Sequence, residues 1–343
     1  MRTDFVLATA LLALVLAGFI SCKQKTQKAS RPPGIYHTTT EWSDTNGQPI
    51  NAHGAGVLFR KGTYYLYGEL KKGKTSLVPG QGWECYRVPV GGVACYSSHD
   101  LVNWKNEGVV LAPNTTDPAH DLHLTKVVER PKVIYNDKTK MFVMWMHVDS
   151  ETYGYSQAGV ATSSSPTGPF QYRGSVQPNG QMVRDLTLFK DDDGSAYLVF
   201  ASEANETMHV VRLADDYLAP TAQEKRILLK QHREAPALFK HRGSYYLITS
   251  GCTGWSPNPA AYAVANAPLG DWQQRGNPCV GPGAETTFQT QGTFVLPIPG
   301  QPDNYVFLAD RWEKTNLEAS QYAWLSLRMV NGRPEISGPA AQK

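Results

Sequence analysis

The sequence predicts an all-β fold, a five-bladed β-propeller, and three observations support this. A hairpin whose second strand is rich in aromatic residues recurs five times along the 343-residue chain. Turn formers and aromatic residues are abundant, with 30 Gly, 23 Pro, 17 Tyr, 11 Phe and 8 Trp, as is typical of short strands joined by tight turns. Between the hairpins the sequence shows no amphipathic helix of three turns, which counts against an α/β barrel.

The five hairpins define five blades in one domain. Their first strands are marked by Val57, Val133, Leu188, Ala237 and Val295. These markers lie 76, 55, 49 and 58 residues apart, with further strand-like runs between them. One hairpin with one or two outer strands per ~50 residues is the signature of a propeller blade. We therefore assign residues 49–343 to a single propeller domain.

The N-terminal residues predict export rather than a membrane span. The uncharged run from Phe5 to Ile20 is too short to cross the ~30 Å hydrocarbon core of a bilayer. It ends at Ser21-Cys22, which is similar to the lipobox of bacterial lipoproteins, in which the cysteine is lipidated after cleavage. We expect a lipoprotein signal peptide over residues 1–21 and a polar tether over residues 22–48. A plain secretory signal followed by a chance cysteine is the alternative.

The cysteine count fits an exported chain. Five is odd, but removal of Cys22 leaves four, an even set that suits disulfides. We expect Cys85 to pair with Cys95 and, by remainder, Cys252 with Cys279, although four cysteines allow three connectivities. The expected location is lipid-anchored, on the periplasmic side or the outer-membrane surface of a bacterium.

Charge and hydropathy narrow the classes of partner. Lys and Arg number 33 against 30 Asp and Glu, and the net charge of +3 is spread along the chain. Nucleic-acid binding needs basic residues concentrated on one face, so no nucleic-acid partner is expected. The mean hydropathy of −0.37 excludes a polytopic membrane protein, so we expect membrane contact only through the N-terminal lipid.

Acidic residues recur at the same position in successive blades. The first strand of each blade lines the central channel, so the residues just before the marker hairpins should converge on one pocket. In blades two to five this position offers Glu129, Asp185, Glu234 and Gln291. One carboxylate at a strand end is more often an exposed solubilising group, but the shared phase favours a common site. Such a ring suits hydrolysis of a glycosidic bond, because crowding raises the pKa of one carboxyl group and makes it an acid.

These segments resemble glycoside hydrolase family 43, whose members are five-bladed inverting glycosidases. The matching motifs are Glu129-Arg130-Pro131-Lys132-Val133, Arg184-Asp185, Arg233-Glu234-Ala235-Pro236 and Gln291-Gly292-Thr293. Within the family the sequence looks most like the exo-β-1,3-galactanase branch. The marks of that branch are Asn51-Ala52-His53-Gly54, Tyr67-Gly68-Glu69, Ser202-Glu203-Ala204-Asn205, Thr253-Gly254-Trp255 and Asp310-Arg311-Trp312. The resemblance covers residues 51–327.

The resemblance implies catalytic roles. Glu234 matches the general acid, and Asp185 matches the aspartate that raises the pKa of the acid and orients it. Ordinary members carry a base aspartate on the first blade, where this chain has Asn-Ala-His at 51–53. In the galactanase branch a glutamine acting as its imidic acid tautomer has been proposed as the base, and Gln291 matches it. Glu129 is the alternative base, or a group that binds sugar hydroxyls. Inversion needs room for a water molecule, so we expect the Gln291 amide and the Glu234 carboxyl to lie ~6.5–9.5 Å apart.

The resemblance also implies substrate contacts. These are Glu69, Glu129, Tyr155, Asn205, Thr253 and Trp255. Trp255 would be a stacking platform, and a place in the propeller core is the alternative. We expect no required cofactor and no metal site. Two roles remain open for His53: it could hold a structural cation in the central channel, or it could be a hydrogen-bonded core histidine.

Three functions compete. We expect an exo-acting, inverting glycoside hydrolase that releases galactose from β-1,3-linked galactan, with plant-type galactan and arabinogalactan as partners and a monomeric state. An α-L-arabinofuranosidase or β-xylosidase of the same family is one alternative, which the missing first-blade aspartate disfavours. A non-catalytic carbohydrate-binding propeller is the other, because binding and catalysis would use the same ring of residues.

Overall fold

The computed structural model describes residues 42–338 together with Met1. The predicted signal peptide, the lipidation site Cys22 and most of the tether lie outside the described residues, so they remain predictions. No described segment forms a helix that is both long and apolar enough to span a bilayer.

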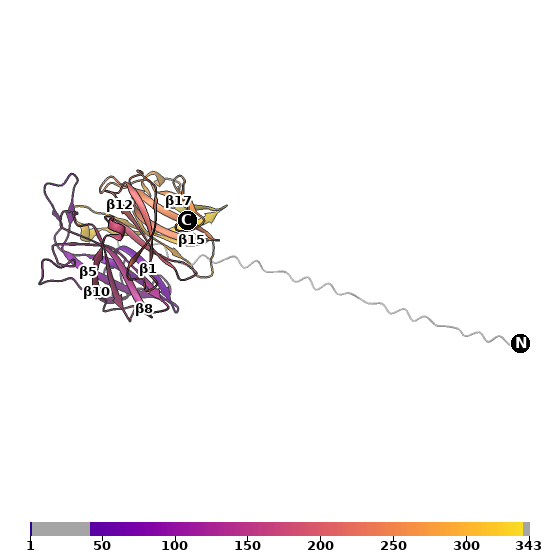
Figure 1. Cartoon of the computed structure of the whole chain (residues 1–343), viewed down its shortest axis with the longest axis horizontal. Coiled ribbons are helices and arrows are strands. Elements are labelled where there is room, and N and C mark those ends of the chain that lie inside the picture. The colour runs from indigo at the N-terminus through magenta and orange to yellow at the C-terminus, as the bar shows by residue number, and fades with distance from the viewer. Residues whose placement is uncertain (2–41, 339–343) are drawn as a thin grey trace. The chain divides into compact units, whose positions relative to one another are not determined.

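The described chain forms the five blades of a β-propeller, which confirms the predicted fold (Figure 1). Blade one contains β1 (His53–Arg60), β2 (Thr63–Lys71), β5 (Val90–Ser98) and β6 (Lys105–Leu111). Blade two contains β7 (Val127–Asn136), β8 (Met141–Asp149), β9 (Gln157–Ser163) and β10 (Gln171–Val176). Blade three contains β11 (Leu186–Lys190), β12 (Ala196–Ser202), β13 (Thr207–Leu213) and β14 (Pro220–Ile227). Blade four contains β15 (Arg233–His241), β16 (Ser244–Gly251), β17 (Ala261–Ala265) and β18 (Gln273–Gln274).

Blade five has one strand more than the others. Its antiparallel strands are β20 (Gln291–Pro297), β21 (Asn304–Arg311), β22 (Gln321–Val330) and β23 (Arg333–Ser337). The preceding strand β19 (Cys279–Val280) pairs with β23 in parallel, so β23 is held between two strands that come earlier in the chain. Outside the blades, β3 (Ser76–Leu77) and β4 (Tyr86–Arg87) form a small hairpin between β2 and β5. The described residues also form three short 3-10 helices, η1 (Pro178–Gly180), η2 (Ala284–Thr286) and η3 (Leu317–Ala319).

The first strand of each blade lies at its inner edge. β1 contacts β7, β7 contacts β11, β11 contacts β15, β15 contacts β20, and β20 returns to β1. This closed ring of inner strands places the residues at their N-terminal ends around one axis. Residues far apart in the sequence therefore meet there.

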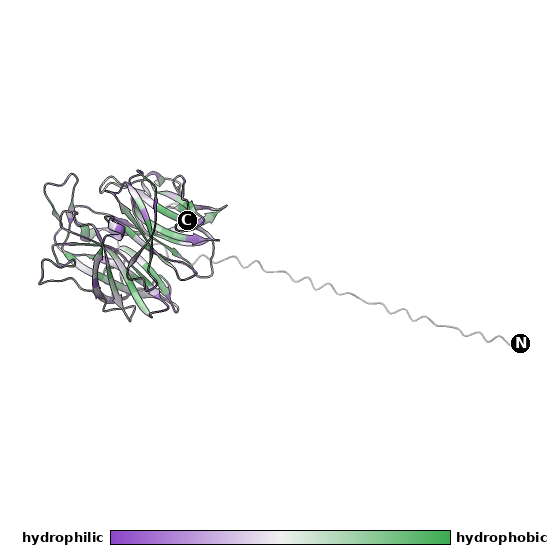
Figure 2. Cartoon of the chain, viewed as in Figure 1, coloured by the Kyte–Doolittle hydropathy of each residue, from purple (hydrophilic) through white to green (hydrophobic). Residues whose placement is uncertain are grey.

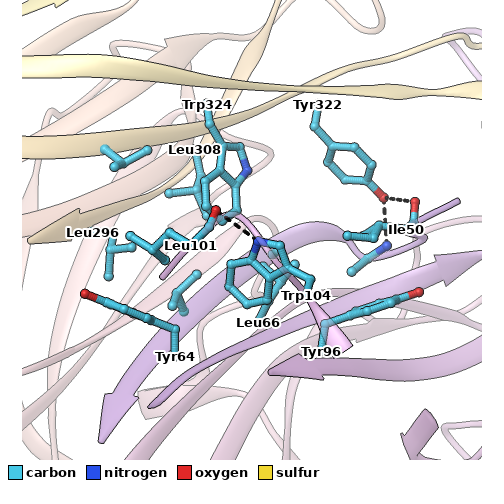
Figure 3. Close-up of a cluster of buried hydrophobic side chains, with 14 of the residues drawn as sticks. Ile50, Tyr64, Leu66, Tyr96, Leu101, Trp104, Leu296, Leu308, Tyr322 and Trp324 are labelled. Carbon is cyan, nitrogen blue, oxygen red and sulfur yellow. Dashed lines mark hydrogen bonds between the residues drawn. The ribbon is translucent and has the colours of Figure 1, made fainter. Parts of the chain in front are cut away.

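The hydrophobic core lies between neighbouring blades, where hydrophobic residues are concentrated in the strands (Figure 2). Blade one packs on blade five through Trp42, Trp104, Tyr322 and Trp324, the last three of which Figure 3 shows. The Trp42 ring centroid lies 5.0 Å from that of Trp324 and 6.0 Å from that of Trp104. Burial of each indole contributes about 5 kcal/mol at ~25 cal/mol per Å². Residues at the end of the predicted tether therefore form part of the propeller core.

The predicted disulfides are wrong, because the four described cysteines are free thiols. Cys95 packs in the apolar core between blades one and two, and Cys279 packs in the core between blades four and five. Cys252 lines a pocket, and Cys85 is buried in the loop that carries the small hairpin. Burial raises the pKa of Cys85 to about 11 and the pKa of Cys252 and Cys279 to about 12, so these thiols stay protonated. The short sequence separation of Cys85 and Cys95 suggested a disulfide, but each thiol packs in a different environment.

Candidate active site

A pocket of about 300 Å³ lies where the inner strands begin. Glu129, Asp185, Glu234 and Gln291 all line it. Glu129 lies in β7, Asp185 directly precedes β11, Glu234 lies in β15 and Gln291 lies in β20. These strands belong to four different blades. The shared phase in the sequence therefore corresponds to a shared place in the structure.

Four inner strands are bulged at the pocket. The registers of β1, β7, β15 and β20 with their neighbouring strands each shift at this end. Within the shifts of β1, β7 and β15 one residue is left-handed: Gly54 has φ 57°, Arg130 has φ 55° and Ala235 has φ 54°. A bulge re-aims the side chains around it, and a left-handed residue other than glycine costs of order 1–3 kcal/mol. The backbone strain of Arg130 and Ala235 thus accompanies the turning of polar side chains into the pocket.

Gln291 lies in a hydrogen-bond network that fixes the orientation of its amide. Its Oε1 accepts hydrogen bonds from Arg130 Nη2 at 2.5 Å and from Trp312 Nε1 at 3.0 Å. Both partners are only donors, so the oxygen must face them and Nε2 must point the other way. Nε2 donates to Glu234 Oε1 at 2.7 Å. The expected separation of ~6.5–9.5 Å is therefore wrong, because the two side chains are in hydrogen-bond contact.

Glu234 is poised to carry a proton. Burial and the nearby charge of Asp185 raise the pKa of Glu234 to about 8, against the opposing effects of the Cys252 hydrogen bond, Arg130 and Gln291. Asp185 is held in place, because its Oδ2 accepts a hydrogen bond from the Ala235 amide at 3.0 Å and forms an ion pair of 2.9 Å with Arg130.

Glu129 is surrounded by donors and cations. Its Oε1 accepts a hydrogen bond from the Tyr153 hydroxyl at 2.8 Å and lies 3.7 Å from Lys71 Nζ. Its Oε2 lies 3.3 Å from His147 Nδ1, and Asp149 lies 3.0 Å from the other ring nitrogen. Burial raises the pKa of Glu129, but Lys71 and His147 outweigh it and hold that pKa well below its usual range. Burial lowers the pKa of His147, but Asp149 and Glu129 outweigh it and raise that pKa to about 9. Glu129 is therefore a carboxylate at every working pH.

Glu69 and Lys71 complete this wall of the pocket from β2. The Lys71 ammonium lies 3.0 Å from Glu69 Oε2. Burial raises the pKa of Glu69 to about 7 despite the opposing effect of Lys71. The two neighbouring acids Glu69 and Glu129 thus differ in protonation near neutral pH, and both line the pocket.

Asn205 contacts the other oxygen of Glu234. Its Nδ2 lies 3.4 Å from Glu234 Oε2 and 3.2 Å from Cys252 Sγ. Glu203, Ala204 and Asn205 are all left-handed, with φ of 53°, 55° and 67°. Three consecutive non-glycine residues in this conformation are strained, and the strain accompanies a side chain aimed at Glu234.

Two of the predicted substrate contacts lie outside the pocket lining. Tyr155 is exposed, and its hydroxyl contacts Ser175 at 3.1 Å. Tyr153 takes the place in the pocket, because Tyr153 itself is left-handed in the turn that follows β8. Thr253 is exposed and accepts a hydrogen bond from Asn258 at 2.8 Å. Glu69, Glu129, Asn205 and Trp255, the remaining predicted contacts, do line the pocket.

Several pocket residues were missed from the sequence. Lys71 follows Glu69 by two residues on β2, so the period of a strand would have placed both on one face. His147 is the cross-strand partner of Glu129, and it could be placed in the pocket only once the register of β7 with β8 was known. Trp83 lies in a loop without a periodic signal. In the sequence, Trp312 stands out only as part of the motif Asp310-Arg311-Trp312.

His53 is a hydrogen-bonded core residue. Its Nδ1 lies 3.0 Å from Asp310 Oδ1, its Nε2 lies 3.2 Å from the Tyr322 hydroxyl, and its ring stacks on Tyr322. Both ring nitrogens are therefore engaged, which leaves neither for a cation. Within the part of the chain that the structure describes, no group of three His, Cys, Asp or Glu side chains is arranged to hold a metal.

Comparisons with known proteins agree on one family. The family model described as Glycosyl hydrolases family 43 matches residues 57–316. A family 43 β-1,3-galactosidase solved with galactodeoxynojirimycin is 39% identical with a TM-score of 0.80, and the match covers 87% of this chain and 97% of that one. The exo-β-1,3-galactanase of Phanerochaete chrysosporium solved with galactose is 37% identical with a TM-score of 0.77, covering 86% of this chain and 65% of that one. An exo-β-1,3-galactanase of Clostridium thermocellum is 36% identical with a TM-score of 0.78, covering 88% and 65%. A comparison with curated proteins found no match.

Proposed function

The chain belongs to glycosyl hydrolase family 43, and we propose that it removes single galactose residues from the ends of β-1,3-linked galactan chains with inversion at the anomeric carbon. The observation that carries the reaction type is Glu234, which is half-buried at the pocket and has a pKa raised to about 8. A carboxylic acid that stays protonated at neutral pH is what a general acid requires.

In the proposed reaction, Glu234 gives its proton to the glycosidic oxygen as the bond from that oxygen to the anomeric carbon breaks. The electron pair of the broken bond stays on the leaving oxygen, and a water molecule attacks the anomeric carbon from the opposite face. The new Glu234 carboxylate is stabilised by the positive charge of Arg130, which also pairs with Asp185. Asp185 keeps the proton on Glu234 until the sugar binds, because its negative charge disfavours a second one nearby.

The proton of the attacking water needs an acceptor on the other face of the sugar. Gln291 can accept this proton only after its amide has moved away from Glu234. The two groups are now 2.7 Å apart and would have to separate by roughly 4 Å more. Glu129 already accepts a hydrogen bond from the Tyr153 hydroxyl and lies beside Lys71 and His147. We therefore assign Glu129 and Glu69 to sugar hydroxyls, together with Asn205. We assign the water to Gln291, whose nitrogen would take the water proton in the imidic acid tautomer, while the proton on its oxygen is lost to solvent and the amide re-forms.

The alternatives fit less well. The relatives at 36–39% identity are named for β-1,3-galactan rather than for arabinan or xylan. A binding module without activity would have no use for a buried carboxyl whose pKa is raised by a second carboxylate. Proton NMR of a β-1,3-galactan digest tests the proposal. We expect α-galactose as the first product, with none from the Glu234→Gln variant; release of arabinose or xylose instead, or binding without turnover, would overturn it.

We also propose that the protein is exported as a monomer anchored by a lipid on Cys22, and that hydrolysis needs no metal. The apolar run that ends at Cys22 supports the anchor. Cys22→Ala should move the protein from the membrane to the soluble fraction, and a mature N-terminus elsewhere would refute the anchor. Activity should persist in EDTA, because the proposed single displacement uses only side chains and water. A loss restored by a divalent cation would contradict that.

A further inference from the structure

The loop between β2 and β5 crosses from blade one toward blades four and five. We name residues 72–89 the strap; it contains the hairpin of β3 and β4. At its start, the Gly73 amide donates to Glu318 Oε2 at 3.1 Å, and Thr75 Oγ1 accepts from the Leu317 amide at 2.9 Å. The strap is thus attached to the blade-five segment between β21 and β22.

Glu84 makes the second attachment of the strap. Its backbone carbonyl accepts a hydrogen bond from Trp255 Nε1 at 2.6 Å, which ties the strap to blade four. Its carboxylate forms an ion pair of 2.6 Å with Lys314 of blade five. With both ends of the segment fixed, the residues beside Glu84 are held at the pocket.

Trp83 precedes Glu84 and lines the pocket. Three tryptophans line it, but two have their indole N–H committed, Trp255 to Glu84 and Trp312 to Gln291. Trp83 is 40% exposed, and its ring meets the edge of Tyr153 at 5.4 Å between centroids. Trp83 is therefore an open aromatic surface at the mouth of the pocket, fixed beside the tyrosine that holds Glu129.

We propose that Trp83 is a specificity-determining residue that stacks on the second sugar from the chain end, the sugar that leaves after cleavage. This inference rests on the proposed function. In an exo-acting pocket the terminal sugar fills the inner part, among Glu234, Gln291 and Glu129, so the leaving sugar lies at the mouth. An exposed indole there offers an apolar face to the C–H surface of a sugar ring.

Two substrates isolate this contact. β-1,3-Galactobiose carries a sugar as its leaving group, whereas β-galactosyl fluoride carries none and needs no ring contact at the mouth. For Trp83→Ala we expect the KM for galactobiose to rise roughly tenfold, equivalent to ~1.4 kcal/mol. We expect kcat/KM for galactosyl fluoride to stay within about twofold of the wild type. Trp83→Phe should restore most of the galactobiose affinity, because it keeps an aromatic face.

The matched control is Leu77→Ala, which removes another exposed apolar side chain from the strap at β3, outside the pocket lining. It should leave both substrates unaffected. An equal loss on both substrates for Trp83→Ala would place Trp83 at the terminal sugar, and unchanged galactobiose kinetics would remove it from binding altogether; either result overturns the proposal. Failure of the proposed function would be visible in the wild type, as no galactose released from galactobiose, whereas this test depends on the ratio between two substrates.

Discussion

Gln291 donates a hydrogen bond of 2.7 Å to the carboxyl group of Glu234. The residue to which we assign the attacking water therefore lies beside the proposed acid. Since inversion requires the acid and the water-activating group on opposite faces of the sugar, this assignment requires that a bound sugar separate the two side chains.

The first prediction concerns Gln291. Gln291→Ala should lower kcat at least ~10²-fold while the KM for galactobiose changes little, because the lost interaction is made mainly in the transition state. Gln291→Glu should raise the upper pKa of the pH–rate profile, because it places a second carboxylate against Glu234. Steady-state kinetics across pH measure both. If Glu129→Gln abolishes turnover and Gln291→Ala stays nearly active, Glu129 is the base.

The second prediction concerns Asp185. Glu234 must be protonated to act, so activity should fall as the pH rises through its pKa of about 8. Asp185→Asn removes a negative charge and frees Arg130, and both changes lower the pKa of Glu234. The alkaline limb of kcat/KM should therefore move to lower pH. Asp271→Asn, at a 94% exposed side chain, is the control. A limb that does not move would make Asp185 merely structural.

The third prediction links Glu234 to stability. Its folded pKa of about 8 lies above the ~4.3 of an unfolded chain, so the folded state binds the extra proton between these values. The contribution to stability is thus present below about pH 4 and is lost as the pH rises toward 8. Glu234→Gln removes the dependence, so its gain in Tm over the wild type should be larger at pH 9 than at pH 5. Equal gains at both pH values would show that the carboxyl is not buried as described.

The fourth prediction concerns Lys132 in the channel. Its buried Nζ donates to the carbonyls of Gly54 at 2.7 Å and Arg130 at 3.3 Å, the two left-handed residues of neighbouring bulges. Lys132→Met should destabilise the fold by ~1–3 kcal/mol for each carbonyl left unsatisfied, and should lower kcat because Arg130 loses its support. Gly56→Ala should have the same effect, since its Cβ would lie 2.5 Å from the Lys132 side chain. Thermal unfolding and kinetics test both; a stable, fully active Lys132→Met variant would contradict this account.

The repeat and the phase of the sequence predicted the fold and most of the pocket. Glu129, Asp185, Glu234 and Gln291 were found because one strand per blade faces the axis, and this geometry depends on the order of hairpins alone. Tyr153 was missed in favour of Tyr155, because a left-handed residue in the turn breaks the alternation that a strand would keep.

Features that depend on loops or on several blades at once were beyond the sequence. The disulfide prediction failed because cysteines ten residues apart, such as Cys85 and Cys95, lie on a loop and in an interblade core. The contact of Gln291 with Glu234 depends on where Arg130 and Trp312 hold the amide oxygen, which involves side chains from two blades. Trp83 lies at the pocket because the distant residues Trp255 and Lys314 bind the strap.

Trp42 packs between the first and last blades, at the junction where the ring of blades closes. A propeller closes a linear chain into a ring, and here the first blade is joined to the last by packed side chains and by the backbone amides of Ala52 and Gly54, which donate to Tyr322 and Asp310. A recombinant form that begins at residue 42 keeps the Trp42 side chain at this junction, whereas one that begins at residue 49 lacks it. Trimming the N-terminus by those few residues therefore removes part of the packing that closes the ring.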